Sequence, residues 1–391
     1  MAPLAVHPSR LIDLVHYAQE SDTTFDDQIQ AYEHFKTSGQ GAGLNPSPFF
    51  YTRWYTWQNP DATQHPSALD HFLHRGASAP LDPAPFIDSV GALRATPQTS
   101  IVEMYLALVE GRSKSVNPSL ATNLARLHAA QDAVHSAISA KILRNEPTEK
   151  KRLVWIQAGT SFKPARWFKP QGARQWDLLC NWYTLSCIDL RFGEIQIRQS
   201  GTKFTGINHV LNQYPEIFER YDQILFLDDD LIIDHDDVDP VFDAAATHNL
   251  DMFQPSVATG SQCVWPDLFE KRDGDVRPVS GCEVMMFGFS KRALRLCTPL
   301  FSRSVSGFGL DLRCSEAVRA KGWTCGVVDR VSVDHLEVID EKSGTYYEFM
   351  RALGINQKFE LFEAIRDHNR LPTFCDLRSA DCHSRGHSPG F

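Results

Sequence analysis

Short runs of nearly unbroken apolar residues are the feature that most restricts the fold of this chain. They occur in its second half, separated by polar or helix-patterned stretches. Consecutive apolar positions suit a strand covered on both faces, as in a parallel α/β sheet. We therefore predict an α/β fold in which helices flank a mostly parallel sheet. The runs are Leu153–Ile156, Leu178–Tyr183, Ile224–Leu227, Val284–Phe289 and Cys325–Val328.

The first hundred residues carry an internal repeat with an offset of 37 residues. We expect one short helix per copy, ended by the repeated glycine, with the two phenylalanines packing between the copies. A histidine in such a repeat is more often structural than catalytic, and we expect that role for both. The repeated residues include Ala31, His34, Phe35 and Gly39 in the first copy and Ala68, His71, Phe72 and Gly76 in the second.

These patterns divide the chain into four segments. Residues 1–98 form a helical repeat region, and residues 99–150 read as a helical linker because apolar residues recur there at helical spacing. A charged stretch around Pro147 marks the next boundary. Residues 151–348 are the predicted catalytic domain, and residues 349–391 a C-terminal helix followed by an irregular tail.

Charge and cysteine usage narrow the classes of protein. A net charge of −9 argues against a nucleic-acid binder, which needs a basic surface. Nine cysteines without framework spacing favour free thiols in a reducing compartment. We see no signal-peptide pattern and no apolar run of about 18 residues that could span a bilayer. We therefore expect a cytoplasmic protein, with peripheral membrane contact left open.

An acidic cluster, Asp228-Asp229-Asp230, directly follows the run Ile224–Leu227. It therefore lies at the carboxyl end of a buried strand, the edge where open α/β sheets bind ligands. Alternation along the strand places Asp228 and Asp230 on one face. Adjacent carboxylates repel unless a cation offsets them, and hard oxygen ligands select Mg²⁺ or Mn²⁺. The alternative is that these aspartates cap a helix beginning near Asp236.

Further motifs follow in order along the same half of the chain. Together with the acidic cluster they resemble a domain-of-unknown-function family related to GT-A glycosyltransferases, over about residues 152–348. The N-terminal repeat is similar to short tandem segments attached to some bacterial glycosyltransferases. The motifs are Gly201–Gly206, Tyr221–Asp230, Gln254–Ser256, Gly281–Met285, Ser306–Asp311 and Val333–His335.

The resemblance implies a GT-A-like (Rossmann-like) domain and a metal-dependent glycosyltransferase of the hexosyltransferase type. Such an enzyme moves a sugar from a nucleotide-sugar donor, here expected to carry a uridine nucleotide, to a hydroxyl of a glycan acceptor. Asp228 and Asp230 match the DxD element, with Asp230 on the metal and Asp228 on the metal or ribose. Asp229 is assigned to the binding of the nucleotide-sugar donor. His335 is the expected third ligand of Mn²⁺ or Mg²⁺, although a lone histidine in a strand is usually structural.

Five other positions are candidates for the same site. Gly201 lets the backbone approach the donor phosphates closely, and Lys203 supplies positive charge to them; the alternative is a solvated lysine in a turn. Asp311 is the candidate general base for the acceptor hydroxyl in an inverting reaction; the alternative is a helix cap. Glu283 and Gln254 are assigned to the acceptor, and Glu283 could equally face solvent.

Two other functions stay open. A Mg²⁺-dependent nucleotidyl- or phosphotransferase would use the same acidic strand end and lysine. A non-catalytic carbohydrate-binding protein could keep the fold without turnover. A zinc site in the tail is disfavoured because the spacing of its candidate ligands matches no standard site. Those ligands are Cys375, Cys382, His383 and His387.

Overall fold

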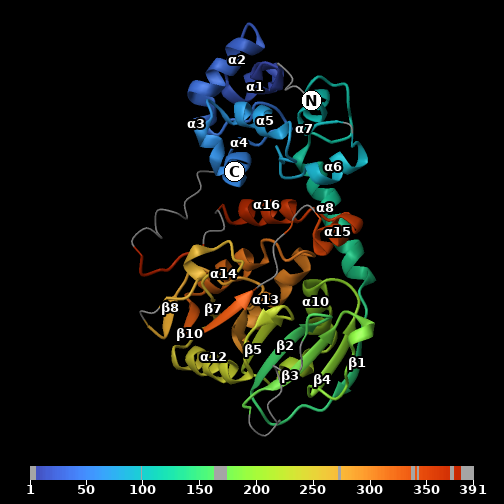
Figure 1. The fold of residues 1–391 in the computed structure, drawn as a ribbon, viewed down its shortest axis with the longest axis vertical. Coiled ribbons are helices and arrows are strands. Elements are labelled where there is room, and N and C mark those ends of the chain that lie inside the picture. Colours follow the sequence, from blue (N-terminus) through green and yellow to red (C-terminus); the bar gives the residue numbers. More distant parts are fainter. Residues whose placement is uncertain are drawn as a thin grey trace. The chain divides into compact units, whose positions relative to one another are not determined.

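The computed structural model describes residues 6–97, 99–162, 174–271, 274–335, 340, 343–369 and 374–379. The chain divides into two compact units, residues 1–127 and 128–391 (Figure 1). The division falls inside helix α8 (Leu120–Ala137), within the segment predicted as a linker. None of the described helices is both long enough and apolar enough to cross a membrane.

The first unit consists of short helices. Five of them begin after an Asp or Ser whose side chain accepts a hydrogen bond from the backbone N–H three residues further on, the usual N-cap arrangement. The helices are α1 (Leu14–Ser21), α2 (Gln28–His34), α3 (Gln40–Ala42), α4 (Thr52–Gln58), α5 (Ala68–Gly76), α6 (Ser89–Ala95) and α7 (Ile101–Val109), with short turns η1 (Pro8–Leu11), η2 (Phe35–Gly39) and η3 (Pro60–Gln64).

The repeated histidines make equivalent contacts. Nδ1 of His34 lies 2.9 Å from the hydroxyl of Tyr17, and Nδ1 of His71 lies 2.6 Å from the hydroxyl of Tyr55. In each case the histidine fixes a tyrosine from the preceding helix of the same copy. The structural role expected for both histidines is therefore confirmed.

The repeated phenylalanines also pack alike. Phe35 and Phe72 each lie edge-on to the tyrosine of their own copy, with ring centroids 5.9 Å apart. Contact between the copies is made by Phe72 with Phe50, at 5.7 Å between centroids. Both phenylalanines are fully buried in the core of the first unit, so the copies share one core, as the repeat predicts.

The prediction that Gly39 ends its helix is wrong. Gly39 lies in the π-helical turn η2, and the chain stays helical until Gly43, whose φ of 77° ends α3. A Cβ atom at Gly39 would lie 2.0 Å from the hydroxyl oxygen of Tyr17. This glycine therefore makes room for the tyrosine that His34 binds.

The described part of the second unit contains a ten-stranded sheet in the order β1-β4-β3-β2-β5-β9-β7-β10-β6, with β8 also on β10. Four of the five predicted runs lie in its strands β2, β3, β5 and β10. The strands are β1 (Ala140–Asn145), β2 (Arg152–Ala158), β3 (Asp177–Trp182), β4 (Ile195–Gln199), β5 (Gln223–Asp228), β6 (Leu231–Ile232), β7 (Met252–Val257), β8 (Val276–Pro278), β9 (Gly288–Ser290) and β10 (Cys325–His335).

The order of the strands reverses between β2 and β5. From β2 the chain moves outward through β3 and β4, all parallel, and then returns to add β5 in parallel on the other side of β2. A reversal of this kind opens a crevice at the carboxyl ends of the two strands. Those ends are Ala158 and Asp228, so the acidic cluster lies at this switch point.

Two parts of the sheet differ from the prediction. The run Val284–Phe289 is a turn followed by the short strand β9, which is antiparallel to β5 and β7. The turn bends the chain so that the carbonyl of Val284 accepts a hydrogen bond from Lys203. Residues 140–145, inside the predicted helical linker, form the antiparallel edge strand β1.

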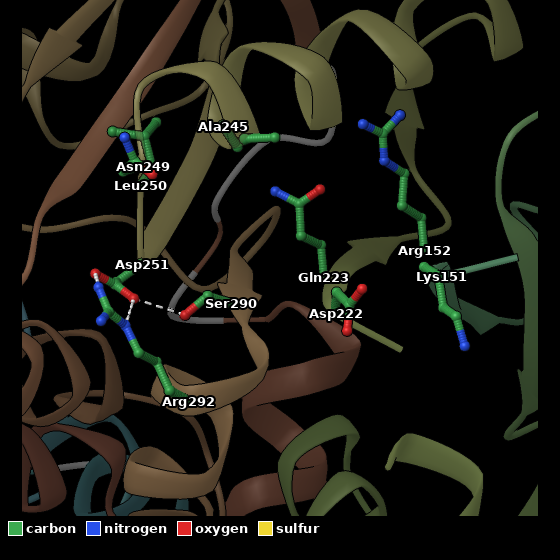
Figure 2. A pocket seen from close by; sticks show the side chains of 11 residues that line it. Lys151, Arg152, Asp222, Gln223, Ala245, Asn249, Leu250, Asp251, Ser290 and Arg292 are labelled. Carbon is green, nitrogen blue, oxygen red and sulfur yellow. Dashed lines mark hydrogen bonds and ion pairs between the residues drawn. The ribbon is translucent and has the colours of Figure 1, made fainter. Parts of the chain in front are cut away.

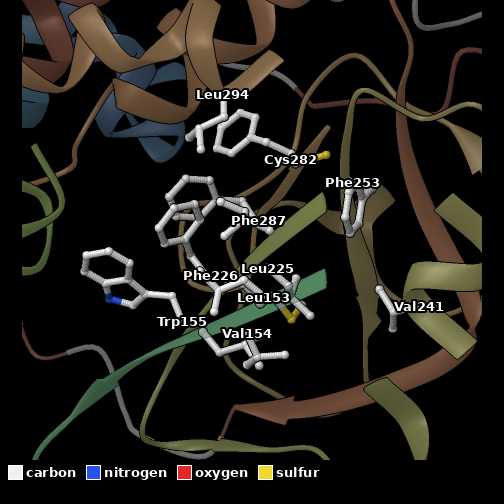
Figure 3. Close-up of a cluster of buried hydrophobic side chains, with 14 of the residues drawn as sticks. Leu153, Val154, Trp155, Leu225, Phe226, Val241, Phe253, Cys282, Phe287 and Leu294 are labelled. Atoms are coloured by element: carbon white, nitrogen blue, oxygen red, sulfur yellow. The ribbon is translucent and has the colours of Figure 1, made fainter. Parts of the chain in front are cut away.

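Helices flank the sheet and share its hydrophobic core (Figure 3). In the centre, the ring of Trp155 in β2 packs at a tilt against Phe226 of β5, which stacks on Phe287; all three are fully buried. The helices are α10 (Lys203–Gln213), α11 (Pro215–Phe218), α12 (His235–Thr247), α13 (Lys291–Cys297), α14 (Leu310–Ala320), α15 (Thr345–Ala352) and α16 (Gln357–His368), with turns η5 (Leu185–Cys187), η6 (Pro266–Leu268) and η7 (Thr298–Arg303).

The expectation of free cysteines holds at seven positions among the described residues. It is wrong at Cys375, which is disulfide-bonded. The other members of the disfavoured zinc set, Cys382, His383 and His387, lie outside the described residues.

Candidate functional site

The acidic cluster forms a tight turn that joins three strand ends. Asp228 ends β5, and the carboxylate of Asp229 accepts hydrogen bonds from the backbone N–H of Gly159, after β2, at 2.8 Å and from the hydroxyl of Tyr183, after β3, at 3.2 Å. Burial, together with the charges of Asp228 and Asp230, raises the pKa of Asp229 to about 6. Asp229 thus ties the ends of β2, β3 and β5 together at the switch point.

Asp230 faces His335 because the backbone brings them together. The residue after Asp230, Leu231, pairs with His335 where β6 meets the end of β10. Oδ2 of Asp230 lies 3.3 Å from Nε2 of His335. Nδ1 of His335 donates to the carbonyl of Gln262 at 3.0 Å, since a carbonyl only accepts. Nε2 is therefore the ring nitrogen directed at the carboxylate.

The pKa of His335 is set by its burial and by its hydrogen bonds. Burial lowers the pKa of His335, but the hydrogen bond to Asp230 and the bond to the Gln262 carbonyl outweigh it and raise the pKa to about 9. At neutral pH the imidazole of His335 is therefore protonated, as long as no other cation neutralises the carboxylate of Asp230.

Asp228 is paired with Lys203. The ammonium of Lys203 lies 2.8 Å from Oδ1 of Asp228 and donates to the carbonyl of Val284 at 2.6 Å. Burial raises the pKa of Asp228, and the lysine opposes that rise. Only 9% of the Lys203 side chain is exposed, which excludes the alternative of a solvated lysine in a turn.

The backbone conformation and the close neighbours of residue 201 explain why a glycine occupies this position. Its φ is 95°, and a Cβ atom there would lie 2.2 Å from the Ile138 side chain and 2.7 Å from the hydroxyl of Thr205. It precedes Thr202, whose side chain caps α10. The glycine therefore fixes the start of the helix that presents Lys203, and its predicted contact with a donor stays a prediction.

The predicted acceptor residues have different surroundings. The side chain of Gln254 is fully buried, accepts from the N–H of Glu283 at 2.6 Å and donates to the carbonyl of Pro255 at 3.1 Å. Such a side chain does not fit a direct acceptor contact, and it holds the Glu283 backbone instead. The carboxylate of Glu283 accepts from the thiol of Cys263 at 3.1 Å, and burial raises its pKa.

Asp311 lies in the first turn of α14, after Gly309, whose φ is 80°. Its carboxylate accepts from the N–H of Leu312 at 2.8 Å, and the residue is only 8% exposed. Burial, opposed by the hydrogen bond from the N–H of Leu312 and supported by the charge of Glu283, raises its pKa to about 7. A carboxyl that is half ionised near neutral pH is suited to accept a proton.

Sequence analysis misses two residues that build this site. Tyr183 packs so closely on Gly159 that a Cβ atom there would lie 2.0 Å from its hydroxyl. Its position at the end of a predicted strand is a signal that could have found it. Glu360 of α16 accepts from the N–H groups of Val305 and Ser306 at 2.8 and 2.9 Å, and so holds the loop before Asp311. No sequence signal connects it to that loop.

The side chains at the acidic turn partly fit the binding of a divalent cation. Among the described residues, no group of three or more His, Cys, Asp or Glu side chains is placed to hold a metal ion. With bonds of about 2.1 Å, two adjacent ligands of an octahedral ion lie about 3 Å apart. The 3.3 Å between Asp230 and His335 is close to that value. Mg²⁺ sites commonly use one or two side chains and complete the shell with substrate phosphates and water.

Comparisons with known proteins add little to this geometry. No family model and no curated protein matches the chain. The structure of A197 from STIV is similar over 49% of this chain and 87% of that one, with 16% identity and a TM-score of 0.30. The structure of S. aureus TarS 1-349 is similar over 56% and 72%, with 12% identity and a TM-score of 0.32. Likenesses this distant carry no functional argument.

Proposed function

We propose that this chain is a metal-dependent glycosyltransferase with a GT-A-like domain, which moves a sugar from a nucleotide-diphosphate donor to a hydroxyl of a carbohydrate acceptor. The supporting observation is the convergence of Asp230 and His335 at the switch point, beside the pair of Asp228 and Lys203. Ligands of α/β sheets bind at this edge.

On the donor side, the residues suit a leaving group that gains negative charge. A bound Mn²⁺ or Mg²⁺ would be held by Asp230 and His335 and would neutralise charge on the diphosphate. Lys203, whose ammonium is paired with Asp228, is the residue proposed to place positive charge near a donor phosphate. Tyr183, with 44% of its surface exposed, offers a partly open ring at the same edge.

On the acceptor side, Asp311 takes the proton from the attacking hydroxyl in an inverting transfer. A pKa of about 7 leaves a substantial fraction ionised at neutral pH. Glu283, whose charge acts on Asp311, is the carboxylate proposed to orient acceptor hydroxyls.

The first test is thermal unfolding with a panel of nucleoside diphosphates, with and without Mn²⁺. A ligand at 100 times its dissociation constant stabilises the native state by about 2.7 kcal/mol, and about 2–4 °C per kcal/mol is expected here. We expect a Mn²⁺-dependent shift with UDP that Asp230→Ala abolishes. Asp132→Ala, which changes an exposed aspartate of α8, is the matched control. No shift with any nucleotide would contradict the proposal.

A second assay separates the remaining functions. With donors labelled in the sugar or in the β-phosphate, a glycosyltransferase transfers only the sugar label. Transfer of phosphate label would show a phosphotransferase. Donor binding with neither transfer of label nor slow hydrolysis of the donor would show a non-catalytic carbohydrate-binding protein.

A further inference from the structure

A cavity lies at the amino ends of β2 and β5, the opposite edge of the sheet from the acidic turn. Figure 2 shows the residues that line it. The cavity measures about 540 Å³, within the range of small-molecule sites. Its walls come from the amino ends of β2 and β5, the last turn of α12 with the segment that leads into β7, the end of β9 and the start of α13. No residue of the site described above lines it. The lining residues used below are Lys151, Arg152, Asp222, Gln223, Ala246, Asp251, Ser290 and Arg292.

Gln223 is the residue that indicates a ligand. It is nine-tenths buried, and Figure 2 shows its side chain extending into the cavity. Within the part of the chain that the structure describes, its amide makes no hydrogen bond. The amide therefore has its donors and its acceptor available to a ligand that enters the cavity.

Two charged groups of the cavity are also available. Neither the ammonium of Lys151 nor the carboxylate of Asp222 has an ion-pair partner among the described residues. The other charges are already paired: Arg292 binds Asp251 through two hydrogen bonds of 2.6 and 2.7 Å, and Ser290 donates to the same carboxylate. The cavity therefore offers a cation, a carboxylate and the Gln223 amide, none of which is paired with another described residue.

These groups define the chemistry of the ligand. Carboxylates and amides are suitable partners for hydroxyl groups, and an ammonium for a phosphate. Arg152, which pairs with Asp243 at 2.7 Å, adds positive charge next to Lys151. Among the described residues that line the cavity, none carries an aromatic ring on which a nucleobase could stack, whereas the exposed Ala246 offers a small apolar surface.

We propose that this cavity binds a sugar monophosphate, with the phosphate at Lys151 and the sugar hydroxyls at Asp222 and Gln223. The site is separate from the proposed transferase centre and does not depend on that function. Its ligand is smaller than a nucleotide sugar and needs no metal.

Titration calorimetry of the full chain with glucose 6-phosphate, glucose 1-phosphate, glucose and inorganic phosphate tests this proposal. We expect at least one hexose phosphate to bind ten-fold or more tightly than inorganic phosphate or glucose. Lys151→Ala and Gln223→Leu should each weaken that binding at least ten-fold. Lys151 is exposed, so its variant is expected to fold; Lys321→Ala, at another exposed lysine, is the matched control.

Asp230→Ala distinguishes the two sites, since it should leave hexose phosphate binding unchanged. Loss of binding in Asp230→Ala would place the ligand at the acidic turn and overturn the proposal. Absence of binding, equal binding of inorganic phosphate, or binding unchanged in Lys151→Ala would also overturn it. Failure of UDP to bind in the presence of Mn²⁺ would affect only the proposed transferase function.

Discussion

Replacing Asp311 by Asn should make the protein more stable at alkaline pH. The pKa of this carboxyl rises from 3.8 to about 7 because folding buries it. Such a group contributes full stability below pH 3.8 and loses it as the pH rises through 7. At 1.36 kcal/mol per pKa unit, the ionised carboxylate destabilises the folded state by about 4 kcal/mol above pH 8. Asparagine keeps an oxygen for the N–H of Leu312 and does not ionise.

The measurement is urea unfolding at pH 5 and pH 8, followed by tryptophan fluorescence. Between these two values the wild type should lose about 3 kcal/mol more stability than Asp311→Asn. The exposed Asp132→Asn should follow the wild type. A parallel change in wild type and Asp311→Asn would refute the reasoning, because the carboxyl would then already be ionised at pH 5.

Three further outcomes are expected. Glu360→Ala should destabilise the protein by about 3 kcal/mol in the same urea assay, because two buried N–H groups lose their acceptor. Glu216→Ala, on the surface, should change stability by less than about 0.5 kcal/mol. Gly201→Ala should lower the unfolding free energy by about 2 kcal/mol, since its φ of 95° and close neighbours leave no room for a Cβ; an unchanged midpoint would contradict this. Lys203→Met should weaken Mn²⁺-dependent UDP binding at least ten-fold by calorimetry, and unchanged affinity would remove this lysine from the donor site.

The central strands could be predicted because their residues are apolar on both faces. Strand β4 could not, because it is buried with polar residues. Gln199 accepts from the amide of Asn181 at 2.9 Å, and Asn181 also donates to Gln157 at 3.0 Å. The amide nitrogen of Asn181 thus pairs with both glutamines across three strands, so a sequence that reads as polar is buried.

Some residues of the candidate site could likewise be predicted from the sequence, and others could not. Asp230, Asp311 and Lys203 follow from local signals: a strand end, a pair of glycines and a Gly-rich turn. The actual place of Gln254 depends on a hydrogen bond to a residue 29 positions away, which no local pattern contains. Tertiary packing alone decides whether such an amide faces a ligand or the backbone.

The pairing of β6 with β10 has a consequence for how this chain tolerates length changes. Asp230 and His335 are 105 residues apart, and their approach depends on the register of a two-residue strand. Because successive residues of a strand point to opposite faces, one inserted residue in β6 would turn the neighbouring side chains away from each other. Surface loops between the two positions can grow or shrink without that effect, so natural insertions should accumulate in those loops and be absent from residues 228–232.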